Sequence, residues 1–429
     1  MLINDIINQT LQDLQKKDYS NFNDSLTLIS QAIQNVDKQI DNLESIDKIL
    51  QYTPENNVLQ LRLYRGLLLI VRNAAPTLDI EYFPRVITSF KQFLLLEETE
   101  WVDKTIQVFW EILANFKRND YINQINSLFE STKIVETPLI HFLFRQFNSD
   151  ESDLTNENLL KLLKIKENYV LNTIFNLYLG ISDNHDSKML LHLIYDIITH
   201  ESFKKWIDSQ KEEVQIKWLE LTSVVIETND DWDNFQLVGL LAWVVPIFLD
   251  YESKLNADTI KDERIEKYLL NSLHILAECS KYKAAIQFFE HEQLLKPLIS
   301  LLKTIHENVK RVTMKSKIEE IVNYSSSKSY IIIILSYMAY QSHKNQELIR
   351  ELGGLALVLS NCQIDENNPF IKEQAILCIK YLLEKNQKNQ QFVAELEAKK
   401  TIDDEVLQEV GYKVDIVDGK VELKKKESN

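Results

Sequence analysis

The sequence predicts an all-α protein built from stacked helical repeats, and three observations support this prediction. Only 7 of the 429 residues are glycine, whereas an average protein contains about 7% glycine, much of it in tight turns and phosphate-binding loops. Apolar residues recur at helical spacing along most of the chain. The chain also contains an internal repeat, because residues 335–352 align with residues 379–396.

The internal repeat indicates which kind of helical stack to expect. Asn345 aligns with Asn389 and Gln346 aligns with Gln390, so the offset between the copies is 44 residues. Periods of about 40–47 residues, with two or three helices in each, are typical of armadillo and HEAT repeats. We therefore expect an armadillo/HEAT-like α-solenoid superhelix.

Composition divides the chain into four segments. Residues 1–58 show amphipathic helices that are more polar than those that follow, as expected of the cap at a solenoid end. Residues 59–310 are expected to hold armadillo-like repeats, and residues 325–400 hold the clearest ones. Residues 401–429 alternate in polarity around Asp418-Gly419, which predicts a small β-hairpin and then a charged tail.

Asparagines mark the first repeats. Arg72 and Asn73 lie in a segment that resembles the signature of the third armadillo helix, and Asn115 occupies the matching place 42 residues later. Between them we expect a short helix, a turn and a new helix that begins near Trp101. Further helical patterns cover residues 121–129, 138–147, 159–165, 169–180 and 188–199, and an acidic loop covers residues 148–158.

The most apolar segment covers residues 235–249. It is shorter than the roughly 20 residues that cross a membrane, and Pro246 interrupts it, so we expect a buried core helix and no transmembrane segment. The first residues lack the pattern of a signal peptide. The cysteines form no C-x-x-C pair, which indicates buried thiols in a reducing compartment. We therefore expect a cytoplasmic protein.

The net charge of −16 restricts the partners. An acidic surface repels phosphate backbones and anionic lipids, so we expect no nucleic-acid or membrane-surface binding. The charge suits a solvated surface or a protein partner with a basic face.

No motif for catalysis or metal binding is present. The 8 histidines are scattered without an H-E-x-x-H pattern, and neither a phosphate-binding G-K-[ST] nor a G-x-S-x-G motif occurs. The acidic cluster at 227–233 lacks the glycine of an EF-hand loop, so a solvated loop or a docking patch is expected there. Gly353-Gly354 suits a turn between helices that needs positive φ. We predict a non-enzyme with no catalytic residues, no metal ligands and no cofactor.

One segment resembles a known family. From Leu352 to Glu373 the sequence reads L-G-G-L-A-L-V-L-S-N-C-Q-I-D-E-N-N-P-F-I-K-E, and it is similar to the C-terminal domain of the ataxin-10 family over residues 325–400. The resemblance implies a scaffold or adaptor linked to cell division or signalling, with a G-protein subunit, a small GTPase or a signalling enzyme as partner. The fungal branch carries a copper-transport name, but 4 methionines and 3 cysteines without a metal motif give that name no support here.

Candidate protein-binding residues follow from the armadillo comparison. Asn73 and Asn115 occupy the place where armadillo asparagines bond a bound peptide, but Tyr337 and Tyr381 stand at the equivalent positions near the C-terminus, so the ladder is broken. Packing between helices is the alternative for these side chains. The Asn367-Asn368-Pro369 segment is expected to cap the following helix, or to form a docking loop. The complete set is Arg72, Asn73, Asn115, Tyr337, Tyr381, Asn361, Asp365, Asn367 and Asn368.

Two other functions stay open. A regulator of a small GTPase is favoured if the acidic cluster at 227–233 faces the groove of the solenoid. A peptide-groove transport receptor requires an unbroken asparagine ladder. For any of these functions we expect a monomer or a weak homodimer.

Overall fold

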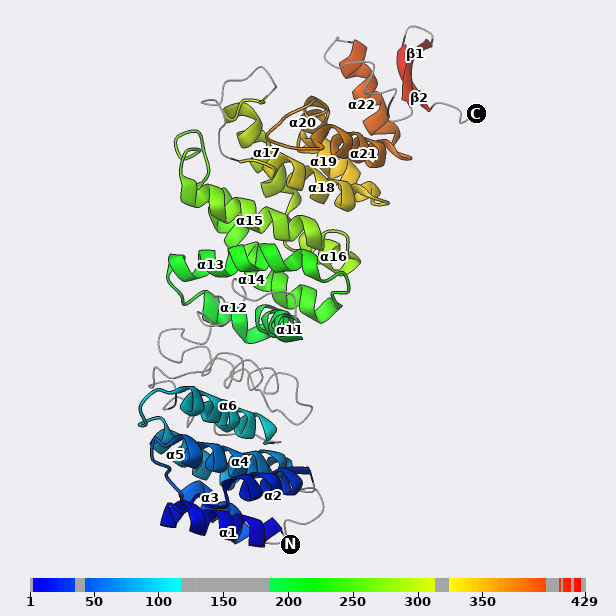
Figure 1. Cartoon of the computed structure of the whole chain (residues 1–429). Coiled ribbons are helices and arrows are strands. Elements are labelled where there is room, and N and C mark those ends of the chain that lie inside the picture. The colour runs from blue at the N-terminus through cyan, green and yellow to red at the C-terminus, as the bar shows by residue number, and fades with distance from the viewer. Residues whose placement is uncertain are drawn as a thin grey trace. The chain divides into compact units, whose positions relative to one another are not determined.

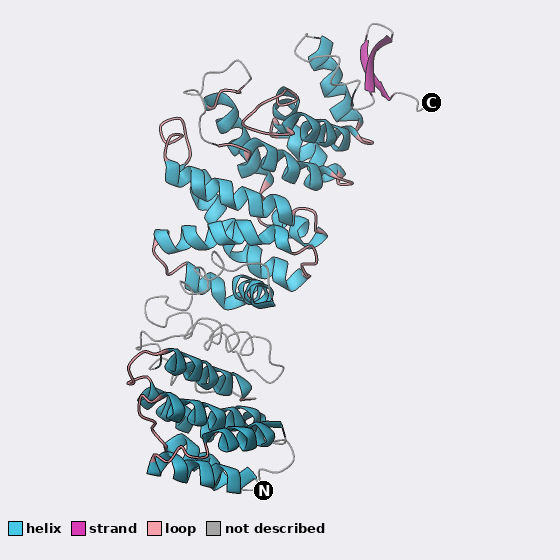
Figure 2. Cartoon of the chain, in the orientation of Figure 1, coloured by secondary structure: helices cyan, strands magenta, loops and turns pink. Residues whose placement is uncertain are grey.

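The computed structural model consists of helices and one hairpin (Figure 1, Figure 2). It describes residues 3–34, 43–116, 128, 185–312, 324–398, 409, 412–417 and 420–425. The predictions for residues 121–129, 138–147, 148–158, 159–165 and 169–180 lie outside this range. The chain divides into two compact units, Met1–Ile197 and Ile198–Asn429, and each is described by itself. The division into four segments stays a prediction.

The first unit contains a row of three helices, α2, α4 and α6, in which each helix packs against the next. Helices α1 and α3 pack together and against α4, and α5 packs against α3 and α6. Helix α11 (His185–Thr199) crosses the boundary between the units. The other bounds are α1 Ile3–Lys16, α2 Phe22–Gln34, α3 Leu43–Gln51, α4 Val58–Ala74, the 3₁₀ turn η2 Ala75–Thr77, α5 Tyr82–Phe93 and α6 Glu100–Asn115.

Aromatic side chains fill the space between these helices. The rings of Phe90 and Phe109 stack with their centroids 4.7 Å apart, and both are fully buried. Tyr64 lies beside them and shares a 3.2 Å hydrogen bond with Ser89, so its hydroxyl is satisfied inside the core. Thr99 accepts a hydrogen bond from the Val102 N–H, which fixes the start of α6 where a helix was predicted to begin.

The second unit repeats a pattern in which a pair of helices precedes a helix of a continuous row. Helices α13, α15, α18 and α21 form a row in which each packs on the next, and the pairs α16–α17 and α19–α20 precede α18 and α21. The bounds are α12 Glu201–Ile207, α13 Glu212–Val225, the 3₁₀ turn η4 Ile226–Thr228, α14 Asn234–Lys254, α15 Glu263–Cys279, α16 Lys283–His291, α17 Leu295–Asn308, α18 Ser327–Ala339, α19 His343–Glu351, α20 Gly354–Ser360, α21 Ile371–Leu383 and α22 Gln387–Ala398. The fold class is therefore confirmed as an all-α, armadillo/HEAT-like helical repeat.

Helix α14 corrects one expectation. It runs for 21 residues straight through Pro246, so the prediction that this proline interrupts the segment was wrong. Its length and composition alone would suffice to cross a membrane, but most of its apolar residues pack inside the unit, and Trp243 donates to the Ile198 carbonyl at 2.9 Å. A Cβ at Gly239 would lie 1.8 Å from the Thr199 carbonyl oxygen, so glycine allows this close packing. Burial on several sides outweighs the hydrogen bond that proline removes.

Other local predictions are confirmed. Gly353 has φ +82° at the turn that starts α20. The three cysteines are buried as free thiols, and burial raises the pKa of each to about 12. The C-terminal hairpin is present, with β1 (Tyr412–Val417) antiparallel to β2 (Lys420–Lys425).

Candidate interaction surfaces

The predicted asparagines of the first unit bind other parts of the same chain. The Nδ2 group of Asn73 on α4 donates to the Ile33 carbonyl of α2 at 3.1 Å. In the next step of the row, Asn115 on α6 donates to the Arg72 carbonyl of α4, also at 3.1 Å. Each amide thus satisfies a carbonyl near the C-terminal end of the preceding helix, where helices leave such groups unpaired. We call Asn73 and Asn115 the asparagine links.

Arg72 belongs to the same arrangement. Its Nη1 lies 2.8 Å from Oε2 of Glu111 on α6, and its Nε donates to Oδ1 of Asn73 at 3.1 Å. Both partners of the ion pair are partly exposed, so the pair contributes at most about 1 kcal/mol to stability. Arg72 orients an asparagine link and joins two neighbouring helices.

The predicted tyrosines of the second unit are arranged differently. Tyr337 on α18 and Tyr340, the residue that follows the helix, are 42% and 47% exposed. The ring of Tyr340 meets that of Tyr381 on α21 with centroids 4.9 Å apart in a T-shaped contact. Partial burial raises the pKa of Tyr381. The charges that Tyr340, Tyr337 and Glu384 can carry raise it further. We call Tyr337, Tyr340 and Tyr381 the tyrosine cluster; Leu377, one turn before Tyr381, adds an apolar side chain that is 43% exposed.

Asp365, Asn367 and Asn368 lie inside the second unit, each no more than 6% exposed. Asp365 Oδ1 accepts hydrogen bonds from the Val312 N–H at 3.1 Å and the Asn367 N–H at 3.2 Å. Its other oxygen accepts from Asn368 Nδ2 at 3.0 Å and lies 3.8 Å from the ammonium of Lys328, which is equally buried. Burial lowers the pKa of Lys328 in spite of the carboxylate. We call these groups the Asp365 junction.

The junction corrects the expected helix cap. Asn368 Oδ1 accepts from the backbone N–H of Lys328 at 3.1 Å, so it caps α18, which begins 41 residues earlier in the sequence. Helix α21, the expected target, is preceded by Phe370 at φ 62° without a side-chain cap. Asn368 faces the core, where the start of α18 offers an unpaired N–H, and this long-range contact replaces the local one.

A docking role for this loop would have to use other side chains than those predicted. Asn361 is also buried and donates to the Leu357 carbonyl at 2.7 Å. The large apolar side chains that the same segment exposes are Ile364 and Phe370, at 68% and 75%. These two apolar side chains were missed because the polar pattern dominates the segment.

The repeated Asn-Gln pairs also have a structural explanation. Asn345 donates to the Met338 carbonyl at 2.8 Å, and Asn389 donates to the Leu382 carbonyl at the same distance. Gln390, which follows Asn389, donates to the next carbonyl of the same helix, that of Leu383, at 2.8 Å. In each repeat this pair therefore fastens a helix to the end of the longer helix before it.

The acidic cluster at 227–233 is divided among separate contacts. Asp233 caps α14 and exchanges a second bond with Gln236. Asp230 accepts from Lys281 at 2.9 Å, and Glu227 meets His274 at 2.6 Å. The cluster thus connects its loop to α14, α15 and the turn that follows α15.

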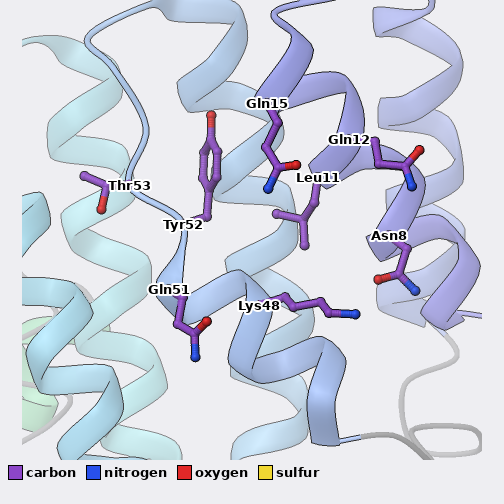
Figure 3. A pocket seen from close by; sticks show the side chains of 8 residues that line it. All are labelled: Asn8, Leu11, Gln12, Gln15, Lys48, Gln51, Tyr52 and Thr53. Carbon is purple, nitrogen blue, oxygen red and sulfur yellow. The ribbon is translucent and has the colours of Figure 1, made fainter.

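The pockets of the described part of the chain offer little acid–base chemistry. An open groove of about 810 Å³ lies between α1 and the end of α3 (Figure 3). Burial raises the pKa of its Tyr52 to about 12, and Lys48 is paired with Glu44 at 3.0 Å. A second pocket of about 420 Å³ lies beside the Glu290–Asn345 hydrogen bond. The groove of the first unit is lined by four neutral amides and four other residues, namely Asn8, Leu11, Gln12, Gln15, Lys48, Gln51, Tyr52 and Thr53.

Comparison with known proteins gives consistent similarities. Residues 327–424 match the family model described as the spinocerebellar ataxia type 10 protein domain. An ataxin-10 homolog of Candida albicans is 50% identical over 458 aligned positions, which cover 99% of each chain. One of Debaryomyces hansenii is 36% identical and covers 86% of this chain and 81% of its own. Human ataxin-10 is 28% identical over 40% of this chain and 38% of its own.

Proposed function

The chain belongs to the ataxin-10 family, and from this premise we propose that it acts as a protein-interaction scaffold or adaptor in the cytoplasm, linked to cell division or signalling. The family and the helical-repeat fold both support a scaffold, because stacked helical repeats present long surfaces to partners. We propose that it acts without catalysis and as a monomer or weak homodimer.

The tyrosine cluster is the observation that supports this function best. Tyr337 near the end of α18 and Tyr340 directly after it expose large rings, whereas the other apolar side chains of that end of the helix, such as Leu335 and Met338, are buried. Tyrosine is enriched at the energetic centres of protein interfaces, because its ring buries a large area while its hydroxyl keeps a polar contact. The cluster and Leu377 therefore form our candidate binding surface, and the net charge of −16 favours a partner with a basic face.

The two alternative functions, a peptide-groove transport receptor and a regulator of a small GTPase, are not favoured by the contacts of their candidate residues. In a peptide-groove receptor the asparagines would be needed for the ligand, but Asn73 and Asn115 each donate to a carbonyl of the chain itself. For a GTPase regulator the acidic cluster would be the contact surface, but Glu227, Asp230 and Asp233 already bond groups within the unit. A G-protein subunit, a small GTPase or a signalling enzyme stays a proposed partner on family grounds.

The test compares partner binding by the full chain and by a Tyr337→Ala/Tyr381→Ala double variant. Both are used to capture partners from the cytosol of the organism of origin, and a captured partner is then purified and titrated. We expect the double variant to bind it at least about tenfold more weakly, as is usual for the loss of interface hot spots. The matched control is Phe235→Ala, which removes an aromatic side chain that is 90% exposed in the same unit.

The outcome is decisive if all variants melt at the same temperature. Loss of binding only in the tyrosine variant supports the surface. Equal binding by the tyrosine variant and the unaltered chain overturns it and moves the interaction to another face. If no partner binds the unaltered chain, the scaffold function itself is wrong.

A further inference from the structure

Glu227, His274 and Glu278 bring their polar atoms together on the second unit. The three potential ligand atoms all lie within 4.8 Å of one another, and His274 Nε2 is 2.6 Å from Glu227 Oε1. His274 and Glu278 are one turn apart on α15, so they share a face of that helix. Glu227 comes from η4, which packs against α15.

The backbone and the ring that hold this cluster are well anchored. Next to Glu227, Ile226 is buried, and its carbonyl accepts from the indole N–H of Trp232 at 3.4 Å. The imidazole of His274 stacks on the ring of Tyr330 from α18, with centroids 5.0 Å apart and an interplanar angle of 20°. Neighbouring helices therefore fix the plane of the imidazole, and such support is what a preorganised site requires.

The electrostatics of the cluster favour a cation. The carboxylate oxygens of Glu227 and Glu278 both lie within 4.8 Å of the imidazole nitrogen of His274, so two acidic side chains meet at this point. Lys281 is the cation in contact, but its Nζ is 2.9 Å from Asp230 and 3.7 Å from Glu278. Lys281 can therefore remain with Asp230 while Glu278 turns toward a bound ion.

We propose that Glu227, His274 and Glu278 form a binding site for a divalent transition-metal cation, with Zn²⁺ as its best match. One imidazole nitrogen and two carboxylate oxygens suit Zn²⁺, whereas Cu⁺ prefers sulfur and Mg²⁺ prefers oxygen alone. Metal–ligand bonds of about 2.0–2.2 Å in a tetrahedron place ligand atoms about 3.4 Å apart. The His274–Glu227 pair must therefore open by less than about 1 Å.

Three protein ligands leave the fourth position of the ion open. Water or a side chain of another protein fills such a position. The side chain of Glu227 is 59% exposed, whereas those of His274 and Glu278 are 19% and 34% exposed, so the ion would be reached from the Glu227 side. This inference is independent of the scaffold function, because the metal can be measured without a partner.

The experiment is a calorimetric titration of the purified full chain with ZnCl₂ in a buffer without chelating groups. We expect one saturable site per chain, and its affinity should fall at least about tenfold in His274→Ala and in Glu278→Gln, because each removes one of three ligands. The control is His291→Ala. His291 also contacts a carboxylate, with Nδ1 2.9 Å from Glu292 Oε1, but its side chain is 83% exposed and no third potential ligand joins this pair among the residues that the structure describes.

The possible results separate clearly. Binding that persists in His291→Ala and is lost in both cluster variants supports the site. The absence of saturable binding in the unaltered chain overturns the proposal, and so does equal binding by the conservative Glu278→Gln variant. Melting curves recorded without zinc identify a variant that fails to fold. Because Glu278 lies at the surface, at least Glu278→Gln is expected to remain folded.

Discussion

The sequence alignment predicts that Asn73 and Asn115 of the first unit and Tyr337 and Tyr381 of the second stand at equivalent positions of the repeat, but the structure places their side chains in different surroundings. Asn73 and Asn115 donate to carbonyls of the preceding helices at 3.1 Å. Tyr337 turns a large part of its ring to solvent. The first unit thus uses the position to hold its helices together, and the second leaves it available.

The difference follows from side-chain reach. An asparagine amide is short and has two donors, so it can satisfy an unpaired carbonyl at the end of an adjacent helix. A tyrosine ring is too long to do this and gains most when its face is covered by another molecule. A polar residue at a predicted binding position can therefore be structural, while the aromatic residue that interrupts the asparagine pattern is exposed.

The largest expected effect tests whether the Asp365 junction stabilises the fold, as the asparagine links do, and is not a docking loop. Asp365→Ala removes the acceptor of three hydrogen bonds and leaves the Lys328 ammonium buried without its carboxylate. Breaking a buried ion pair on one side costs about 3–5 kcal/mol. We expect the free energy of unfolding, measured by urea denaturation, to fall by this amount.

The control for this prediction is Asp231→Ala, which removes an exposed carboxylate of the same unit. Its effect should stay within about 0.5 kcal/mol. Equal stability of Asp365→Ala and the unaltered chain would show that the junction is not needed for folding. A docking role for Asp365, Asn367 and Asn368 would then be favoured again.

A smaller effect tests the comparison itself. Asn115→Ala removes the hydrogen bond to the Arg72 carbonyl and should lower the free energy of unfolding by about 1 kcal/mol. Tyr337→Ala removes an exposed ring and should change it by less than about 0.5 kcal/mol. In the partner titration the order should reverse, with weaker binding only in Tyr337→Ala. If Asn115→Ala weakens binding at unchanged stability, the asparagines are ligand contacts after all.

The sequence was informative wherever the physical signal is local. Scarce glycine and the 44-residue offset from Asn345 to Asn389 predicted the helical repeat, and the positive φ of Gly353 follows from a local turn. Contacts between distant segments were not predictable. Nothing near Asn368 reveals that it caps α18, and 47 residues separate Glu227 from His274. The exposure of Tyr337 also depends on what the neighbouring helices cover.

The smallest expected effect is a pH dependence of the free energy of unfolding. It distinguishes a polar group that bonds within the chain from one that is exposed to solvent. His200 caps α12 through Nδ1, which accepts from the Ser202 N–H at 3.1 Å, and burial lowers its pKa below the ordinary 6.5. Protonation removes this acceptor.

A lowered histidine pKa means that the unfolded chain binds the proton first, so the stabilisation is present above pH 6.5 and is lost as the pH falls below it. We expect the unaltered chain to lose less than about 1 kcal/mol between pH 7 and pH 5 relative to His200→Asn, because the histidine is partly exposed and asparagine caps without titrating. The control is His291→Asn, which replaces an exposed histidine. Its loss of stability between pH 7 and pH 5 should equal that of the unaltered chain. Parallel pH profiles for the unaltered chain and His200→Asn would mean that the histidine cap does not stabilise α12.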